Sequence, residues 1–326
     1  MRSRFLLSTF AILAVCGTAP ISSQEEKAPP PTAPQETLES VLQRAYRLIS
    51  EGKFKPAQEE LEKAAALAGG PCGECLLGFS HVYAAERKWD QAVDAVQQAI
   101  PLLKSPGVRA RAYDQLGVAL VARGGPDALS KAEEALRQGA DLGGAWGTLA
   151  RYNLAEVLAR QQKWAETAEA SRRYIQEAGP EGTALKEARV LLCGARAHQP
   201  EEAPPAEQEQ TAAPSPSEGE DTRPPILAAA PMRIEGDVHR PEILRQVKPV
   251  YSEQARKAGT RGTVIVEAII DDEGCVRNIR PLQELPDGLT EAAMAAVGQW
   301  VFSPATLEGR PVKVYYVLTI NFQVGP

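Results

Sequence analysis

Residues 41–64 read VLQRAYRLISEGKFKPAQEELEKA, and residues 76–99 read LLGFSHVYAAERKWDQAVDAVQQA. In both stretches an aromatic residue follows a short polar turn, and small or aliphatic residues then recur at helical spacing. Ala57 and Ala92 hold equivalent places, which gives a period of about 35 residues. A single helical hairpin cannot bury its apolar face alone, so the pattern predicts a stack of several hairpins.

The same pattern continues along the chain. A third unit contains Leu116 and Leu120, a fourth contains Trp164, and residues 183–196 form a closing helix. The whole array, residues 36–197, resembles the tetratricopeptide repeat (TPR). This resemblance implies an all-α solenoid with a concave groove that binds peptides or partner proteins. The positions expected to face the groove are Tyr46, His81, Asp114 and Glu156.

These groove positions leave the ligand open, because they do not form the lysine and asparagine clamp that some TPR proteins use for a C-terminal carboxylate. We interpret His81 as a groove-wall or packing residue rather than a metal ligand, since no second ligand lies at helical spacing. The other histidines, His198 and His239, join no triad or metal constellation, and no phosphate-binding glycine loop is present. We therefore expect no enzyme activity, no cofactor and no metal.

In the last third of the chain the pattern changes from helical to alternating. Apolar residues alternate over 264–270, residues 271–274 form a turn, and residues 276–282 return as a second strand. Residues 289–300 place their apolar side chains on one helical face, and residues 312–322 alternate again. These elements predict a small two-layer α+β domain after the all-α solenoid, hence a multidomain fold.

The C-terminal segment, residues 241–326, resembles the TonB C-terminal domain. In this resemblance Gly259 and Gly262 bracket a helix-to-strand turn that needs positive φ, and Ser252 departs from the proline usual in the family. TonB proteins that transmit the proton-motive force also carry a spanning helix, which we do not expect here. The matching residues are Pro249, Tyr251, Ala255, Gly259, Gly262, Val264, Val266, Gly274, Val276, Leu289, Ala292, Ala293, Ala296, Val297, Trp300, Phe302, Pro304, Ala305, Gly309, Pro311 and Val312.

The TonB resemblance implies recognition by strand addition, in which an extended segment of a TonB-dependent outer-membrane receptor pairs with an exposed sheet edge. The alternative is that the chain's own tail or a homodimer partner covers this edge. Tyr315, Val317 and Thr319 would face away from the core. The residues expected to form the edge are Lys313, Val314, Tyr315, Tyr316, Val317, Leu318, Thr319 and Asn321.

Residues 198–240 are rich in proline, glutamate and glutamine, so they bury too little apolar surface to fold. As an extended polyproline chain, residues 199–231 would span on the order of 100 Å. The composition fits both a plain linker between domains and a tether whose reach across an envelope space matters.

The N-terminus has the pattern of an export signal over residues 1–23, with arginines before a short apolar run. Two processing routes stay open: cleavage near Ser23, or cleavage before Cys16 followed by lipidation of that cysteine. Residues 24–35 would form a disordered spacer. Either route places the protein in the periplasm or cell envelope. Membrane attachment is expected only in the second route, through the lipid on Cys16.

The chain has five cysteines. Cys72 and Cys75 make a poor zinc site, because structural zinc takes four ligands, and they lack the strand context of a thioredoxin-like motif. A local disulfide or two unpaired thiols are the remaining readings. Cys193 and Cys275 have no evident partner.

The net charge of −6 argues against a nucleic-acid partner. Two functions remain open. The first is a periplasmic adaptor, in which the repeats hold one protein and the TonB-like domain binds a receptor in TonB-dependent transport. The second is a non-transducing scaffold in envelope assembly, whose TonB-like domain mediates homodimer or other protein contacts.

Overall fold

The computed structural model describes residues 36–199 and 230–323. The expected signal peptide, Cys16, the spacer and most of the linker lie outside these residues. The chain divides into two compact units, Met1–Asn153 and Leu154–Pro326. The boundary falls within one helix, Gly144–Arg160, and each unit is described by itself.

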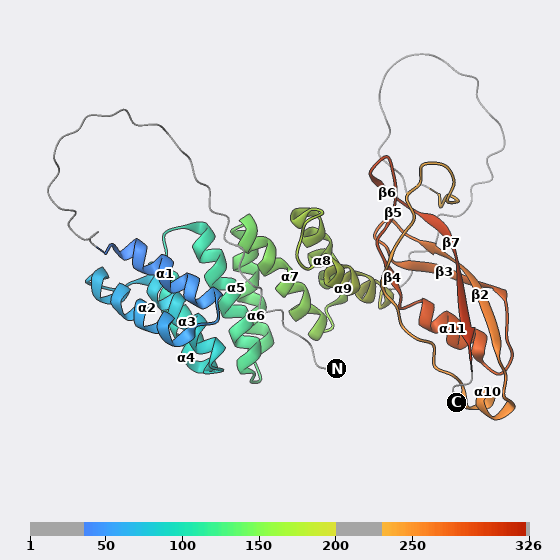
Figure 1. The fold of residues 1–326 in the computed structure, drawn as a ribbon, viewed down its shortest axis with the longest axis horizontal. Helices are drawn as coiled ribbons and strands as arrows, with labels where there is room; N and C mark the ends of the chain where they lie inside the picture. The colour runs from blue at the N-terminus through green and yellow to red at the C-terminus, as the bar shows by residue number, and fades with distance from the viewer. Residues whose placement is uncertain (1–35, 200–229, 324–326) are drawn as a thin grey trace, which may run out of the picture. The chain divides into compact units, whose positions relative to one another are not determined.

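The first unit is a row of antiparallel helical hairpins, each helix lying beside the next in chain order (Figure 1). The helices of the row are α1 (Leu38–Ser50), α2 (Phe54–Ala68), α3 (Gly73–Ala85), α4 (Trp89–Ala99), the 3₁₀ turn η1 (Ile100–Leu102), α5 (Pro106–Arg123), α6 (Ala128–Asp141) and α7 (Gly144–Arg160). The predicted helical repeat is confirmed.

Small residues set how closely these helices pack. A Cβ atom at Gly78 on α3 would lie 2.4 Å from Cδ2 of Leu61 on α2, so any larger residue here would have to displace the Leu61 side chain. Ala57, Leu61 and Ala64 of α2 are fully buried. The alanine-rich pattern therefore encodes close helix contacts.

The second unit contains the last helices of the repeat array and the C-terminal sheet domain. The helices are α8 (Trp164–Ala178) and α9 (Leu185–Ala197), then α10 (Glu253–Ala258) and α11 (Leu289–Val297). The strands are β1 (Ile243–Arg245), β2 (Gly262–Ile270), β3 (Val276–Gln283), β4 (Val301–Phe302), β5 (Ala305–Leu307), β6 (Arg310–Val312) and β7 (Val314–Phe322).

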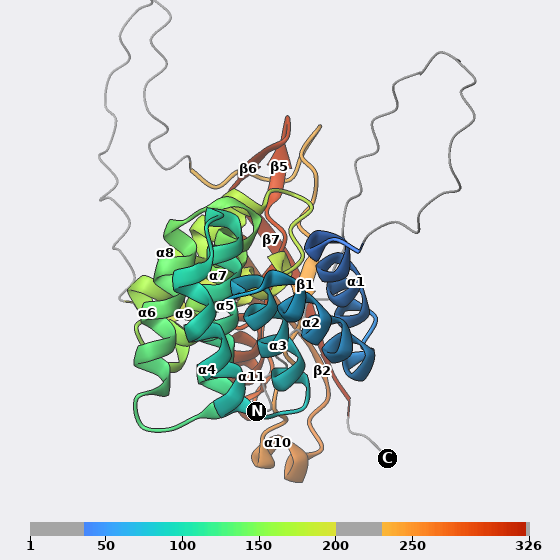
Figure 2. The same ribbon diagram turned by 90° about the vertical axis from the view of Figure 1, so that its left-hand side faces the viewer.

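The main sheet of the C-terminal domain is antiparallel, in the order β3-β2-β7. Helix α11 packs against it, while α10 and the β5–β6 hairpin lie at opposite ends of the domain (Figures 1 and 2). The core includes Trp300, Phe302 and Leu289. The indole N–H of Trp300 donates to the Val247 carbonyl over 2.8 Å. This bond holds the segment before α10 against the end of α11.

The expected final strand over residues 312–322 is divided in the structure. Residues 310–312 pair with β5 in a short hairpin, and the long strand begins at Val314. Gly259 and Gly262 have φ of +68° and +146°, as predicted. Ser252 caps α10, since its Oγ accepts the Ala255 N–H over 3.0 Å. Nowhere in residues 36–199 and 230–323 does a helix reach the length and apolarity needed to cross a membrane.

Candidate protein-binding sites

The strand β7 forms one edge of the three-stranded sheet and pairs with β2 along its whole length, from Val314 opposite Ile270 to Phe322 opposite Gly262. Its side chains alternate strictly. Val314, Leu318 and Ile320 are buried in the core, as the sequence pattern predicts for one face of a half-buried strand.

The other face of β7 points away from the core. Val317 is 52% exposed, Thr319 and Asn321 are exposed, and Tyr315 is half-buried. Lys313 precedes the strand, and Tyr316 is half-buried on the core side. Of the residues expected at this edge, only the odd-numbered ones therefore present side chains to the outer face.

The direction of the backbone groups along β7 follows from one contact with the end of the linker. Met232 donates its N–H to the Lys313 carbonyl over 3.0 Å, and Tyr315 donates its N–H to the Met232 carbonyl over 2.9 Å. Backbone groups of a strand alternate in direction from residue to residue. Val317, Thr319 and Asn321 thus point their N–H and C=O groups to the same outer edge as Tyr315.

A buried carboxylate lies beside this edge on the outer face of the sheet. Glu267 of β2, opposite Val317, is only 4% exposed. It forms ion pairs with Arg280 of β3 and, over 3.6 Å, with Arg233. The Arg233 guanidinium also lies 5.7 Å from the centre of the Tyr315 ring. The segment after Met232 is thereby attached to the outer face by charge as well as by backbone bonds.

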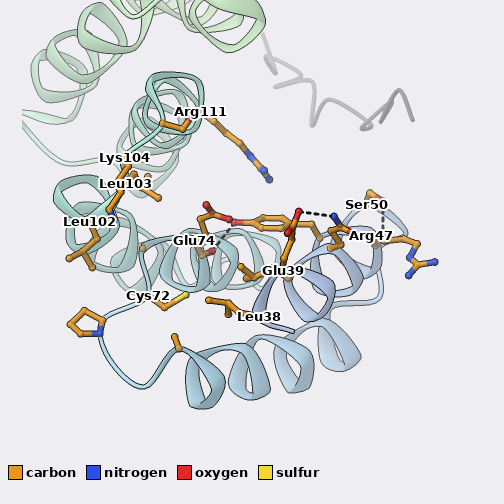
Figure 3. Close-up of a pocket in the computed structure, with 17 residues that line it drawn as sticks. Leu38, Glu39, Arg47, Ser50, Cys72, Glu74, Leu102, Leu103, Lys104 and Arg111 are labelled. Carbon is orange, nitrogen blue, oxygen red and sulfur yellow. Dashed lines mark hydrogen bonds between the residues drawn. The ribbon is translucent and has the colours of Figure 1, made fainter. Parts of the chain in front are cut away.

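A second candidate site is an open groove of about 1460 Å³ in the first unit. Helix α1, the start of α3, residues 102–105 and Arg111 of α5 line it (Figure 3). Tyr46 is among the lining residues and donates its hydroxyl to the Glu74 carbonyl over 2.8 Å. Burial, partly offset by the Arg111 charge, raises the pKa of Tyr46 to about 12.

Arg111 contacts two of the predicted groove residues. Its guanidinium lies 4.5 Å from the centre of the Tyr46 ring and 3.0 Å from Nε2 of His81. Burial and this positive charge hold the pKa of His81 well below its ordinary value, so the imidazole stays neutral. Arg111 was not among the predicted groove residues, because no sequence motif marks an arginine on α5 that contacts side chains of both α1 and α3.

Asp114, one turn further along α5, is buried rather than presented to a ligand. The amide of Asn153 donates to its Oδ1 over 2.6 Å. Burial raises its pKa to about 7, although the Asn153 hydrogen bond and the Arg111 charge lower it. Glu156, the fourth predicted groove residue, is half-buried on α7 in the second unit.

The four cysteines within the described residues form two disulfides. Cys72 pairs with Cys75 at the start of α3. The expectation that Cys193 and Cys275 lack a partner is wrong, because these two are bonded across a separation of 82 residues. Sequence reasoning had no signal for this pair, since nothing local marks two positions so far apart.

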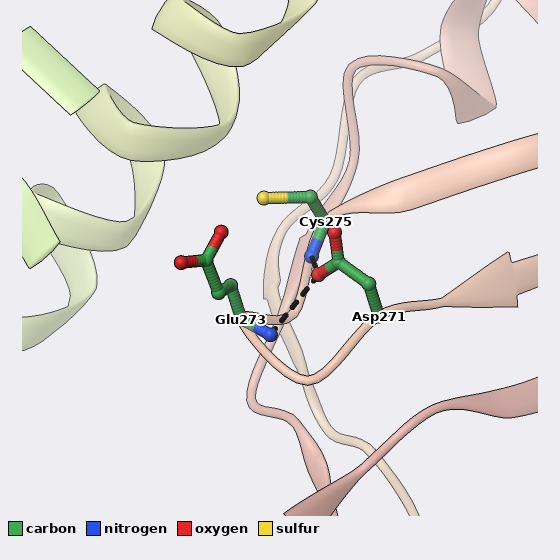
Figure 4. A group of neighbouring side chains, drawn as sticks. All are labelled: Asp271, Glu273 and Cys275. Carbon is green, nitrogen blue, oxygen red and sulfur yellow. Dashed lines mark hydrogen bonds between the residues drawn. The ribbon is translucent and has the colours of Figure 1, made fainter. Parts of the chain in front are cut away.

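Asp271, Glu273 and Cys275 place ligand atoms within 4.8 Å of one another (Figure 4). The Cys275 sulfur is already bonded to Cys193, and both carboxylates form ion pairs with arginines. The three groups are thus already bonded within the protein, and residues 271–274 form the turn between β2 and β3, as predicted.

The protein has a helical repeat with a groove and a small domain with an open sheet edge. These features define a protein-interaction adaptor. Comparison with known families identifies the kind of C-terminal domain. Residues 247–324 match the profile of the Gram-negative bacterial TonB protein C-terminal family. The C-terminal domain is thus TonB-like, and the resemblance stated from its sequence is confirmed.

One relative is Protein TonB of Vibrio cholerae, 36% identical over 80 residues. That match covers 24% of this chain and 33% of the relative, so the chain spans only a third of the protein it matches.

Among solved structures, the helical part is similar to Pseudomonas aeruginosa PilF, at 15% identity and a TM-score of 0.41, covering 49% of this chain and 68% of that one. It is also similar to the TPR protein YrrB, at 19% identity and a TM-score of 0.38, covering 48% and 75%. In the Cut9–Hcn1 tetramer the match has 17% identity and a TM-score of 0.41, and it covers 49% of this chain but only 30% of that one.

Proposed function

We propose that this protein is an adaptor of the cell envelope: its helical repeats hold one protein partner, and its TonB-like domain binds an extended segment of an outer-membrane receptor. The export signal expected at residues 1–23 supports the envelope location. The observation that carries the proposal is the outer edge of β7, where the alternation leaves the backbone groups of Val317, Thr319 and Asn321 pointing outward.

Strand addition suits this edge chemically. A guest strand gains main-chain hydrogen bonds from the three outward positions, and its side chains contact Val317 and Thr319 on the exposed face. The groove lined by Tyr46 and Arg111 would bind the other partner, an extended or helical peptide whose side chains match a mixed polar and apolar surface.

The test is recovery of outer-membrane receptors from solubilised envelopes by the full chain, identified by mass spectrometry. Val317→Pro removes an outward N–H without disturbing the pairing with β2, since proline is tolerated on edge strands. Val317→Thr keeps that N–H and serves as the matched control. We expect receptors with the wild type and with Val317→Thr, and at least a tenfold loss with Val317→Pro. Equal recovery by all three would exclude this edge.

One observation favours the second candidate function, a non-transducing scaffold in envelope assembly. Met232 already pairs with the start of β7, which is how a chain covers its own sheet edge. A scaffold would recover its partners through the helical repeats alone, and its TonB-like domain would serve homodimer or other contacts. The Val317→Pro variant then recovers the same proteins as the wild type.

A further inference from the structure

The last repeat helix and the TonB-like domain are joined by a covalent bond outside the peptide chain. Cys193 lies on α9, and Cys275 immediately precedes β3, with their Cα atoms 5.3 Å apart. Both belong to the second compact unit. Because the proline-rich segment 198–240 lies between them in sequence, the disulfide closes that segment into a loop.

Charges of opposite sign meet around this disulfide. Arg172 of α8 contacts the Glu273 carboxylate over 2.6 Å, and Arg189 of α9 donates to the Glu273 carbonyl over 2.9 Å. Arg196 of α9 pairs with both Glu273 and Asp271, the latter over 3.4 Å. Three arginines of the helical pair therefore surround one acidic turn of the sheet domain.

The β2–β3 turn is built to present these groups. Oδ1 of Asp271 accepts the N–H of Glu273 over 3.0 Å and that of Cys275 over 2.8 Å. Gly274 has φ of +88°, and a Cβ atom there would lie 2.0 Å from the Phe302 carbonyl oxygen, so no other residue fits. Glu273 and Cys275 consequently point to the same side of the turn (Figure 4).

We propose that this contact is a redox-controlled latch. In the oxidised protein the disulfide and the three arginines hold the TonB-like domain against α8 and α9, and the linker cannot act as a long tether. Reduction leaves only the charge contacts. Arg172 and Arg196 keep 38% and 32% of their side-chain surface exposed, and ion pairs of such exposure hold weakly. The TonB-like domain can then separate from α8 and α9.

The redox step needs a protein dithiol as reductant. Its thiolate attacks Sγ of Cys193, which is half-buried, whereas Cys275 is only 2% exposed. The Cys193–Cys275 bond breaks, and Cys275 leaves as a thiolate that takes up a proton. The second thiol of the reductant then resolves the mixed disulfide and frees Cys193. Two electrons and two protons pass to the protein, and the reductant becomes a disulfide.

The test compares the full chain in oxidised and reduced form by small-angle X-ray scattering. Cys16, Cys72 and Cys75 are replaced by serine, so that the reductant acts on one bond alone. We expect the separation of α9 from the TonB-like domain to grow on reduction, by no more than the roughly 100 Å that an extended proline-rich chain of that length spans. Cys193→Ser with Cys275→Ser should be open without reductant.

A second measurement shows whether the bond is present. After cleavage at a protease site placed in the linker, the oxidised fragments should migrate together on a denaturing gel and separate once reduced. Fragments that separate without reductant would overturn the latch. So would a reduced or double-serine protein with the dimensions of the oxidised one, because the charge contacts alone would then hold the two parts.

Discussion

The backbone N–H of Tyr315 donates to the carbonyl of Met232 over 2.9 Å, so the end of the linker occupies the first position on the outer edge of β7. The same contact gives the direction of every later backbone group on this strand. Whether the outer edge of β7 is free can therefore be tested on the protein alone, without a binding partner.

We expect amide hydrogen exchange along β7 to alternate. The N–H groups of Tyr316, Leu318 and Ile320 point to β2 and should be protected, whereas those of Val317 and Thr319 should exchange far faster. Tyr315 should be protected in the wild type and lose protection when residues 230–234 are deleted. NMR exchange measurements on the full chain check this. Strong protection of Val317 and Thr319 in the free protein would mean that the edge is covered.

The stability of the helical repeat should fall as pH rises toward neutrality. Asp114 has a folded pKa of about 7, far above its unfolded value near 4. A raised carboxyl pKa contributes stability below the unfolded pKa, and that stability is lost between about pH 4 and pH 7, by at most roughly 1.4 kcal/mol per pH unit.

Denaturant unfolding of the wild type and of Asp114→Asn, at pH 5 and pH 7.5, measures this effect. The asparagine variant cannot ionise, so its pH dependence should be the weaker of the two. If the unfolding free energies of both proteins changed equally with pH, the pKa of Asp114 would not be raised by folding.

Glycine at position 274 should be irreplaceable, and the hairpin glycine Gly309 offers a matched control. Gly309 has φ of +76° but open space around a Cβ atom, so Gly309→Ala should cost about 1 kcal/mol of unfolding free energy. Gly274→Ala should cost several times more, because its methyl group meets the Phe302 carbonyl. Thermal unfolding of the two variants checks the order. Similar melting temperatures would contradict the close approach.

The charge contacts of the latch should weaken in acid. The pKa of Glu273 is lowered: burial raises it, but the Arg172 hydrogen bond and the charges of Arg172 and Arg196 outweigh burial. Its contribution is therefore complete above the ordinary glutamate pKa and is lost as pH falls through the folded value. Asp271 has the opposite shift, since burial raises its pKa despite the Cys275 N–H and the charges of Arg196 and Arg277.

Small-angle X-ray scattering of the reduced protein between pH 7 and pH 3 measures the loss of the Glu273 charge contacts. The oxidised protein is the reference. We expect the reduced protein to expand further as Glu273 is protonated, and the oxidised protein to keep its dimensions. Reduced Glu273→Gln should have, at pH 7, the larger dimensions that the reduced wild type reaches only in acid. A reduced protein of constant size across this range would rule out a role for these charges.

Most of the fold could be predicted from local patterns in the sequence. The spacing of Ala57 and Ala92 predicted the helical pairs, and the alternation along residues 264–270 and 312–322 predicted both long strands and the exposure of Val317. These features succeed because helix and strand periodicity depend on neighbouring residues.

The missed features join residues that are distant in sequence. Neither Cys193 with Cys275 nor Arg111 with His81 and Tyr46 lies within one repeat, and chain distance gives no register for such pairs. The linker composition predicted an extended segment that could separate the two domains. Composition cannot show that residues on either side of such a segment are bonded to each other.

The position of Met232 sets how long any guest strand on β7 can be. Between it and Phe322 about six residues of edge remain, which span about 20 Å. A strand pair so short buries little surface, and contacts of that size form and dissociate readily. This edge therefore favours rapid exchange of guest strands over tight capture. If the proposed function holds, one copy of the protein would serve many receptors in succession.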